Sequence, residues 1–157
     1  MISIDPLFKY LSVFFLFINA CLYIWGCRIH KCTVALKYFT AYITIICTIQ
    51  IVAFVYAHFK KNNLYLKHFY FIIQFVVLSL FFGELFTRTQ KKVISCILVI
   101  IILILGIQYY TTPDLFYRFN NLEIFITSIP LIVYSIVHLY NSLNKPPKYM
   151  YINIQYN

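Results

Sequence analysis

The residues of this chain that could do chemistry stand singly inside long apolar runs, and six of them align in the last run. At about 100° of rotation per helical residue, the six side chains fall within a stripe about 80° wide. They are Glu123, Thr127, Pro130, Tyr134, His138 and Asn141. Polar groups on one face of an apolar helix need partners, so we predict that this stripe faces neighbouring helices.

Two histidines and two carboxylates stand close to the boundaries of the apolar runs. If consecutive runs form antiparallel helices, these groups lie near one end of the molecule: His58, His68, Asp114 and Glu123. Imidazoles and carboxylates together could bind a divalent metal or relay protons. The alternative is that the histidines anchor helix ends and that the polar groups join helices by hydrogen bonds. We take this second interpretation as the leading one.

A third polar set interrupts the run "HFYFIIQFVVLSLFFGELF", which begins at His68. We expect His68 at one boundary of this run and Glu84 at the other. Glu84 stands four residues before Arg88, the helical spacing that favours an ion pair. Gln74 is therefore the deep polar residue of the set, suited to an interhelical hydrogen bond.

Catalysis is the least favoured function. The sequence has no nucleophile elbow, phosphate-binding loop or paired-acid spacing. The stretch "CRIHKC" offers two thiols and an imidazole, but its spacing matches no closed zinc site. We therefore predict no catalytic residue, no metal site, no cofactor and no disulfide framework.

The elements that must position these residues are five long apolar stretches. A bilayer core about 30 Å thick requires about 20 apolar residues of helix. The qualifying stretches are residues 7–27, 34–57, 68–86, 93–110 and 122–142. None alternates strictly between apolar and polar residues, and a lipid-exposed backbone must satisfy its own hydrogen bonds, so helices are favoured over strands.

Composition places the whole chain among integral membrane proteins. Of its 157 residues, 62% are hydrophobic and only 11% are charged, outside the range of soluble domains. The net charge of +9 comes from basic residues between the apolar runs, where they mark topology. We therefore expect the lipid bilayer, and not nucleic acid, as the main partner.

The connections between the runs are short, which predicts one antiparallel all-α bundle over residues 1–157 with a short cytoplasmic tail at 143–157. They read "RIHKCT", "HFKKNNLYLK", "TRTQKK" and "TTPDLFYRFNN". In the last of these, Thr112 can cap, Pro113 suits the first helical position and Asp114 suits the positive helix end. A short interfacial helix carrying Phe116, Tyr117 and Phe119 is expected there.

The distribution of bases predicts the orientation. One side of the predicted bundle carries eight: Arg28, Lys31, Lys37, Arg88, Lys91, Lys92, Lys145 and Lys148. The other side carries five: Lys9, Lys60, Lys61, Lys67 and Arg118. The richer side is expected in the cytoplasm, which places the N-terminus outside and the C-terminus inside.

The stretches "NLYLKHFYFIIQF" and "LEIFITSIPLIVYSIVHLYNSL" resemble a group of uncharacterised multi-pass inner-membrane proteins of Bacteroidota, rich in Ile, Phe, Tyr and Asn. The resemblance implies a polytopic inner-membrane fold and supplies no activity or cofactor. In that group the segment corresponding to "YMYINIQYN" continues into further apolar helices. The resemblance therefore also allows a C-terminally truncated copy.

Two functions remain open from sequence. The leading hypothesis is a non-enzymatic multi-pass inner-membrane protein, the membrane part of a sensor or a subunit of a larger assembly, with another membrane protein or a second copy as partner. The alternative is a small permease or proton or cation carrier that uses the stripe of the last run. A carrier would line a hydrated path with these groups, whereas a scaffold would hold them paired and dry.

Overall fold

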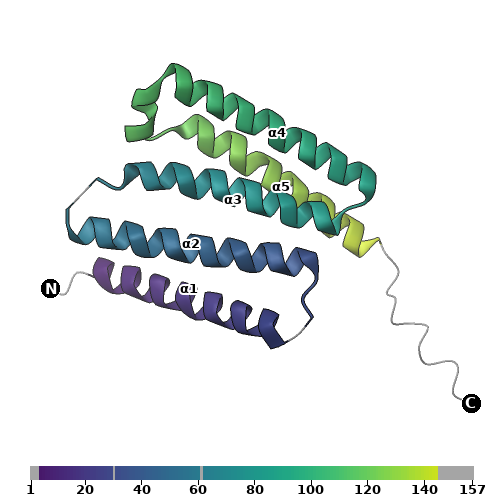
Figure 1. Cartoon of the computed structure of the whole chain (residues 1–157), viewed down its shortest axis with the longest axis horizontal. Coiled ribbons are helices and arrows are strands. Elements are labelled where there is room, and N and C mark those ends of the chain that lie inside the picture. Colours follow the sequence, from purple (N-terminus) through teal and green to yellow (C-terminus); the bar gives the residue numbers. More distant parts are fainter. Residues whose placement is uncertain (1–3, 30, 61, 145–157) are drawn as a thin grey trace, which may run out of the picture.

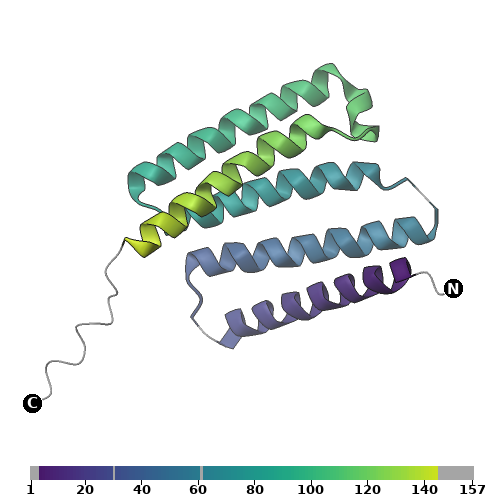
Figure 2. The ribbon, with the colours of Figure 1, turned by 180° about the vertical axis from the view of Figure 1, so that it is seen from behind.

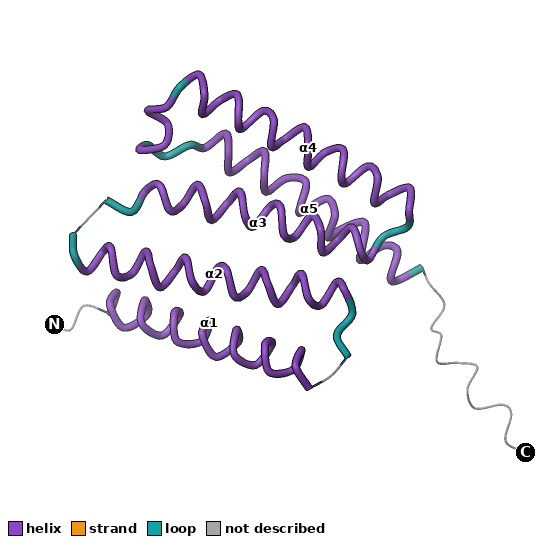
Figure 3. The backbone as a smooth tube through the Cα atoms, in the orientation of Figure 1, coloured by secondary structure: helices purple, strands orange, loops and turns teal. Residues whose placement is uncertain are grey.

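The computed structural model of the chain describes residues 4–29, 31–60 and 62–144, almost entirely as helices (Figure 3). In chain order these are α1 (Ile4–Ile29), α2 (Val34–His58), α3 (Leu64–Leu85), α4 (Arg88–Thr111), the 3-10 helix η1 (Pro113–Tyr117) and α5 (Asn121–Leu143). The described part of the chain contains no strand. The predicted all-α bundle is thus confirmed, whereas most of the predicted tail, residues 145–157, lies outside the described residues.

Each of the five α-helices is long and apolar enough to cross a membrane. The shortest, α3, has 22 residues and is about 33 Å long at a rise of 1.5 Å per residue. That length exceeds a hydrocarbon core of about 30 Å. Helices α1, α4 and α5 extend beyond both ends of their predicted apolar runs, and α2 ends one residue later than predicted. Helix α3 begins four residues before its predicted run and ends one residue before the end of that run.

Local capping explains where several helices begin. The Thr33 hydroxyl accepts the backbone N–H of Leu36 at 3.3 Å and closes the first turn of α2. At the start of α4, Gln90 Oε1 accepts the backbone N–H of Thr87 at 3.2 Å. The "T-x-x-Q" pattern therefore starts α4 at Arg88, five residues before the predicted apolar run.

The five helices run alternately up and down, with α3 at the centre of the contacts. Helices α1, α2 and α3 lie side by side in chain order, and α4 and α5 lie beyond α3 (Figure 1). From behind, α5 crosses α3 obliquely towards its own C-terminal end (Figure 2). Within the described residues α1 packs only against α2, whereas α3 contacts α2, α4, α5 and η1.

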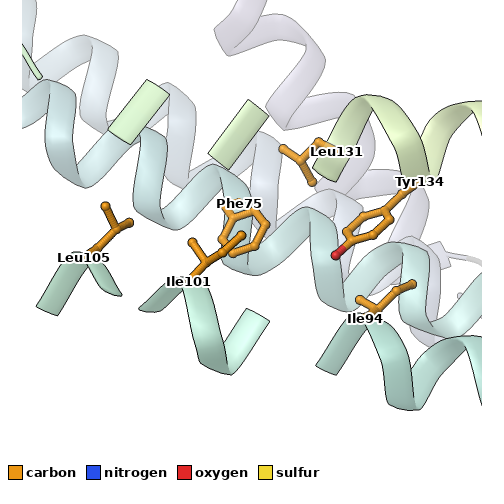
Figure 4. Packing of buried hydrophobic residues seen from close by; sticks show 6 residues of the cluster. All are labelled: Phe75, Ile94, Ile101, Leu105, Leu131 and Tyr134. Atoms are coloured by element: carbon orange, nitrogen blue, oxygen red, sulfur yellow. The ribbon is translucent and has the colours of Figure 1, made fainter. Parts of the chain in front are cut away.

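The main hydrophobic core joins α3, α4 and α5 (Figure 4). It consists of Phe75, Ile94, Ile101, Leu105, Leu131 and Tyr134. Phe75 is completely buried at its centre. A second, smaller cluster of Ala20, Ile43 and Cys47 joins α1 to α2. Large apolar side chains also cover the outside, as expected of helices that face lipid.

The connection between α4 and α5 forms the short helix predicted for it. Pro113 occupies the start of η1, and Asp114 lies in its first turn. Thr112 stands at the cap position, but its side chain makes no capping bond, contrary to the prediction. Phe119 lies beyond the end of η1 and is exposed, as is Tyr117 on the helix.

Candidate functional site

A buried hydrogen-bonded centre joins three helices at the end of the bundle that carries η1. His68 on α3 places Nδ1 2.5 Å from Oε2 of Glu123 on α5. Tyr109 on α4 donates its hydroxyl hydrogen to the same Glu123 oxygen at 2.8 Å. Its oxygen also lies 2.8 Å from His68 Nδ1. We call His68, Tyr109 and Glu123 the interhelical centre.

The second nitrogen of His68 determines how protons are arranged in the interhelical centre. His68 Nε2 lies 3.1 Å from the backbone carbonyl oxygen of Arg118. A carbonyl oxygen only accepts, so Nε2 carries a hydrogen and donates it. Nδ1 and the carboxyl group must then share one further proton. The pair is neutral overall either as imidazolium with carboxylate or as imidazole with carboxylic acid.

This neutrality explains how an acid can be buried in an apolar bundle. Only 1% of Glu123 and 3% of His68 is exposed. An isolated charge would be strongly disfavoured at such a place, whereas a neutral, hydrogen-bonded pair is tolerated. Within the chain, the imidazole and the Oε2 oxygen of the acid thus satisfy each other.

Helix boundaries position each member of the interhelical centre. Because α3 begins at Leu64, His68 lies one turn inside the helix, and its side chain is buried between helices. The Asn120 side chain accepts the backbone N–H of Glu123 at 3.3 Å, which holds this acid in the first turn of α5. The acid therefore also benefits from the positive end of the helix dipole.

The short helix η1 closes the interhelical centre from the end of the bundle. It carries Phe116, whose ring centroid lies 5.6 Å from that of His68 and 5.4 Å from that of Tyr109. The chain then passes through Arg118, which supplies the carbonyl acceptor. An aromatic cover of this kind excludes water and keeps the polar contacts strong.

A cavity of only about 10 Å³ borders His68, Asn120 and Glu123. That space is enough for about one water molecule. Two buried polar atoms, Glu123 Oε1 and Asn120 Nδ2, have no hydrogen-bond partner in the described part of the chain. The cavity thus offers a place for a structural water, and its volume is far below that of a hydrated passage.

The predicted stripe of α5 does face the bundle. Three members of the stripe are buried: Glu123, Thr127 and Tyr134. Tyr134 is also part of the main core (Figure 4). His138 is half-buried, and the centroid of its ring lies 6.3 Å from that of Phe82 and 6.0 Å from that of Phe86. The stripe therefore supplies packing along most of its length and hydrogen bonding mainly at its Glu123 end.

The Thr127 hydroxyl does not satisfy the backbone carbonyl that Pro130 leaves free. The proline leaves the carbonyl of Ile126 without its helical donor. The Thr127 hydroxyl donates instead to the carbonyl of Glu123, at 2.8 Å, one turn earlier. This bond adds a side-chain contact to the backbone within the first two turns of α5, next to the interhelical centre.

The four groups expected near one end of the molecule, two histidines and two acids, do not form a single cluster in the described part of the chain. His58 and Asp114 are exposed, and only His68 and Glu123 come together. No group of three or more His, Cys, Asp or Glu side chains in the described part of the chain is arranged to hold a metal ion. All four residues are close to a helix end in the sequence. Closeness to a helix end does not determine whether a side chain points into the bundle or away from it.

The two other polar residues of the third run also differ from expectation. Glu84 pairs with Lys91 at 2.5 Å and not with Arg88. The reason is that α3 ends at Leu85, so the helical spacing to Arg88 is broken. Gln74 is partly buried, and its Oε1 is buried without a partner in the described residues. Its predicted interhelical hydrogen bond is absent there.

Sequence reasoning missed Tyr109 and the Arg118 carbonyl. Tyr109 stands beside Tyr110 at the end of α4, where two tyrosines are typical of an interfacial aromatic belt. The two tyrosines differ only in their place around the helix. Tyr109 lies four residues after Leu105 and eight after Ile101, which puts it on the buried face of α4. In a helix that is apolar all round, this face cannot be recognised from periodicity.

Comparisons of the chain with protein-family models, curated proteins and solved structures give no match. The resemblance to inner-membrane proteins of Bacteroidota accordingly stays a prediction.

Proposed function

We propose that the chain is a non-enzymatic multi-pass protein of a bacterial inner membrane, which serves as the membrane-embedded subunit of a larger assembly. The observation that carries the proposal is the closed state of the interhelical centre. Its acid and its imidazole each have a partner inside the chain, and both are buried. Groups engaged in this way hold helices together and are not presented to a substrate.

The size of the adjoining space supports a scaffold over a carrier. A proton or cation carrier must connect its ionisable group to water on both sides of the membrane. Beside Glu123 the structure has a cavity of about 10 Å³, and Phe116 covers the end of the bundle. Along the rest of the stripe, Tyr134 is packed in the core and His138 contacts aromatic rings.

The proposed orientation places the interhelical centre and η1 outside, together with the N-terminus. It rests on the excess of basic residues, eight against five, at the opposite side. Helices α2 and α3 meet at the same end of the bundle as α4 and α5 (Figure 1). The loop 59–63 should therefore be outside as well.

The test compares wild-type protein with Glu123→Gln in proteoliposomes that contain a pH-sensitive dye, alongside thermal unfolding in detergent. Glutamine keeps the shape of the acid, and an amide NH2 in the place of Oε2 can donate one hydrogen to His68 Nδ1 and the other to the Tyr109 hydroxyl oxygen. We expect no proton flux above empty liposomes from either protein and a small change in melting temperature. Glu84→Gln, which changes an exposed acid at the other end, is the matched control.

A wild-type flux that disappears in Glu123→Gln, at unchanged melting temperature and with Glu84→Gln still active, would overturn the proposal. That result would identify the chain as a proton carrier.

A further inference from the structure

A groove lies between α2 and α3 next to the interhelical centre, on the lipid-facing side of the bundle. Its volume is about 370 Å³. The residues that matter here are Gln50 and Ala53 of α2, Lys67 and Tyr70 of α3, and Phe119. Lys67 and Phe119 also border the small cavity beside Glu123, so the groove is separated from the interhelical centre by a single layer of side chains.

Gln50 is the unusual residue of this groove. The hydroxyls of Thr40, Thr44 and Thr48 on the same helix donate to the carbonyl one turn earlier, at 2.8 to 2.9 Å. The side chain of Gln50 is exposed and makes no hydrogen bond within the described part of the chain. An amide that faces hydrocarbon without a partner is costly, so its environment must supply a polar atom at this depth.

Lys67 gives the groove a positive rim. Its Nζ lies 5.1 Å from the centre of the Phe119 ring, a cation–π contact that holds the ammonium beside the groove. The ion pairs of the described residues are His68–Glu123 and Glu84–Lys91, so Lys67 has no carboxylate partner there. No acidic residue lines the groove. Its charge therefore complements an anion at the membrane surface.

The depths of the polar groups match the layers of a phospholipid. At 1.5 Å per residue, Lys67 is about 4.5 Å and Tyr70 about 9 Å along α3 from Leu64. Gln50 is about 12 Å along α2 from its end at His58. Along the helix axes, the residue that carries the cation is thus nearest the end of the bundle, followed by the residues that carry a hydroxyl and an amide. In a phospholipid the phosphate lies likewise above the ester carbonyls.

We propose that this groove binds one anionic phospholipid. The phosphate lies on the Lys67 ammonium, and the ester carbonyl oxygens accept hydrogens from Gln50 and Tyr70. One acyl chain lies against α2, where the small Ala53 side chain leaves room. This inference goes beyond the scaffold function and does not depend on it, since a scaffold or a carrier could each hold such a lipid.

The test is native mass spectrometry of the whole chain in mild detergent with phosphatidylglycerol or phosphatidylcholine of identical acyl chains. We expect the wild type to retain phosphatidylglycerol about fivefold more, the usual effect of one basic residue at an anionic membrane surface. Lys67→Gln should remove this preference. Gln50→Leu should lower retention of both lipids equally, because both carry the ester groups. Lys92→Gln, at an exposed site on α4, is the matched control and should change neither.

Four results would contradict the proposal. Equal retention of the two lipids by the wild type would show that the groove has no preference for an anion. An unchanged preference in Lys67→Gln would show that Lys67 does not bind the phosphate. Equal binding of glycerol phosphate would assign the site to free phosphate esters. A dimer that dissociates in Gln50→Leu, with lipid retention unchanged, would show that a second copy of the chain occupies the groove. Far-ultraviolet circular dichroism confirms that each variant keeps its helices.

Discussion

At the scale of single residues, Tyr109 and Tyr110 show how much one position on a helix decides. Tyr109 donates to Glu123 at 2.8 Å inside the bundle. Tyr110, its neighbour in sequence, is 88% exposed. The two side chains are chemically identical, so the difference between them comes only from the 100° step of the helix. They form a natural pair for testing the interhelical centre.

We expect Tyr109→Phe to lower the free energy of unfolding by about 1 kcal/mol, the value of one buried hydrogen bond. Tyr110→Phe should leave stability unchanged, because its hydroxyl lies at the surface. Unfolding of both variants in mixed detergent micelles measures the difference. Equal stability of the two variants would mean that the Tyr109 hydroxyl contributes nothing to the interhelical centre.

At the scale of elements, small residues on α3 explain why this helix can contact so many neighbours. Ser79 is fully buried, and Gly83 is buried one turn further on. A Cβ added at Gly83 would make an ordinary contact, 3.7 Å from Lys91 Cγ, so alanine would also fit there and the tighter packing is at Ser79. Small side chains of this kind allow close helix packing in lipid, where no hydrophobic force drives helices together.

We expect Ser79→Leu to destabilise the bundle by about 1 to 3 kcal/mol, the usual cost of overpacking a filled core. Ser79→Ala should be nearly neutral, because the hydroxyl oxygen has no partner among the described residues. Ser95→Leu on α4 is the control, since that side chain is exposed and leucine is favourable towards lipid. Thermal melting in detergent measures all three. If Ser79→Leu melts like Ser95→Leu, the tight packing at this position is refuted.

At the scale of the whole molecule, the chain is asymmetric. Helices α3, α4 and α5 share the main core and the interhelical centre, whereas α1 contacts only α2 within the described residues. The proposed orientation turns the interhelical centre, the groove and η1 to the outside. The loops beyond α1 and α3 then face the cytoplasm.

This orientation predicts the accessibility of single cysteines introduced into a cysteine-free background. Cysteine at Asn62 or Asp114 should react with an impermeant maleimide added to intact cells, because both residues are exposed at the η1 end. Cysteine at Thr89 should react only after the membrane is opened. Thr89 is preferable to Gln90, whose side chain is bonded to Thr87. The reverse pattern would invert the proposed topology.

The sequence by itself determined the number and type of elements. Five apolar runs of sufficient length, without water to satisfy their backbones, leave helices as the stable form. It also determined the inward direction of Glu123, Thr127 and Tyr134, because a polar stripe on an apolar helix has one favourable side. In η1, Pro113 and Asp114 indicated a short helix from local chemistry alone.

Only the tertiary structure decided which polar groups meet. His68 and Glu123 are 55 residues apart, and His68 and Tyr109 are 41 apart. Their contact depends on the rotation and axial shift of three helices relative to one another. The polar stripe fixes the inward face of α5, but α3 and α4 are apolar over most of their surface, so one face suits lipid as well as protein and the residue pattern does not decide their rotation. The packing of the three helices around Phe75 and the Phe116 ring beside His68 set this rotation. With this rotation, His58 and Asp114 remain exposed and do not join the interhelical centre.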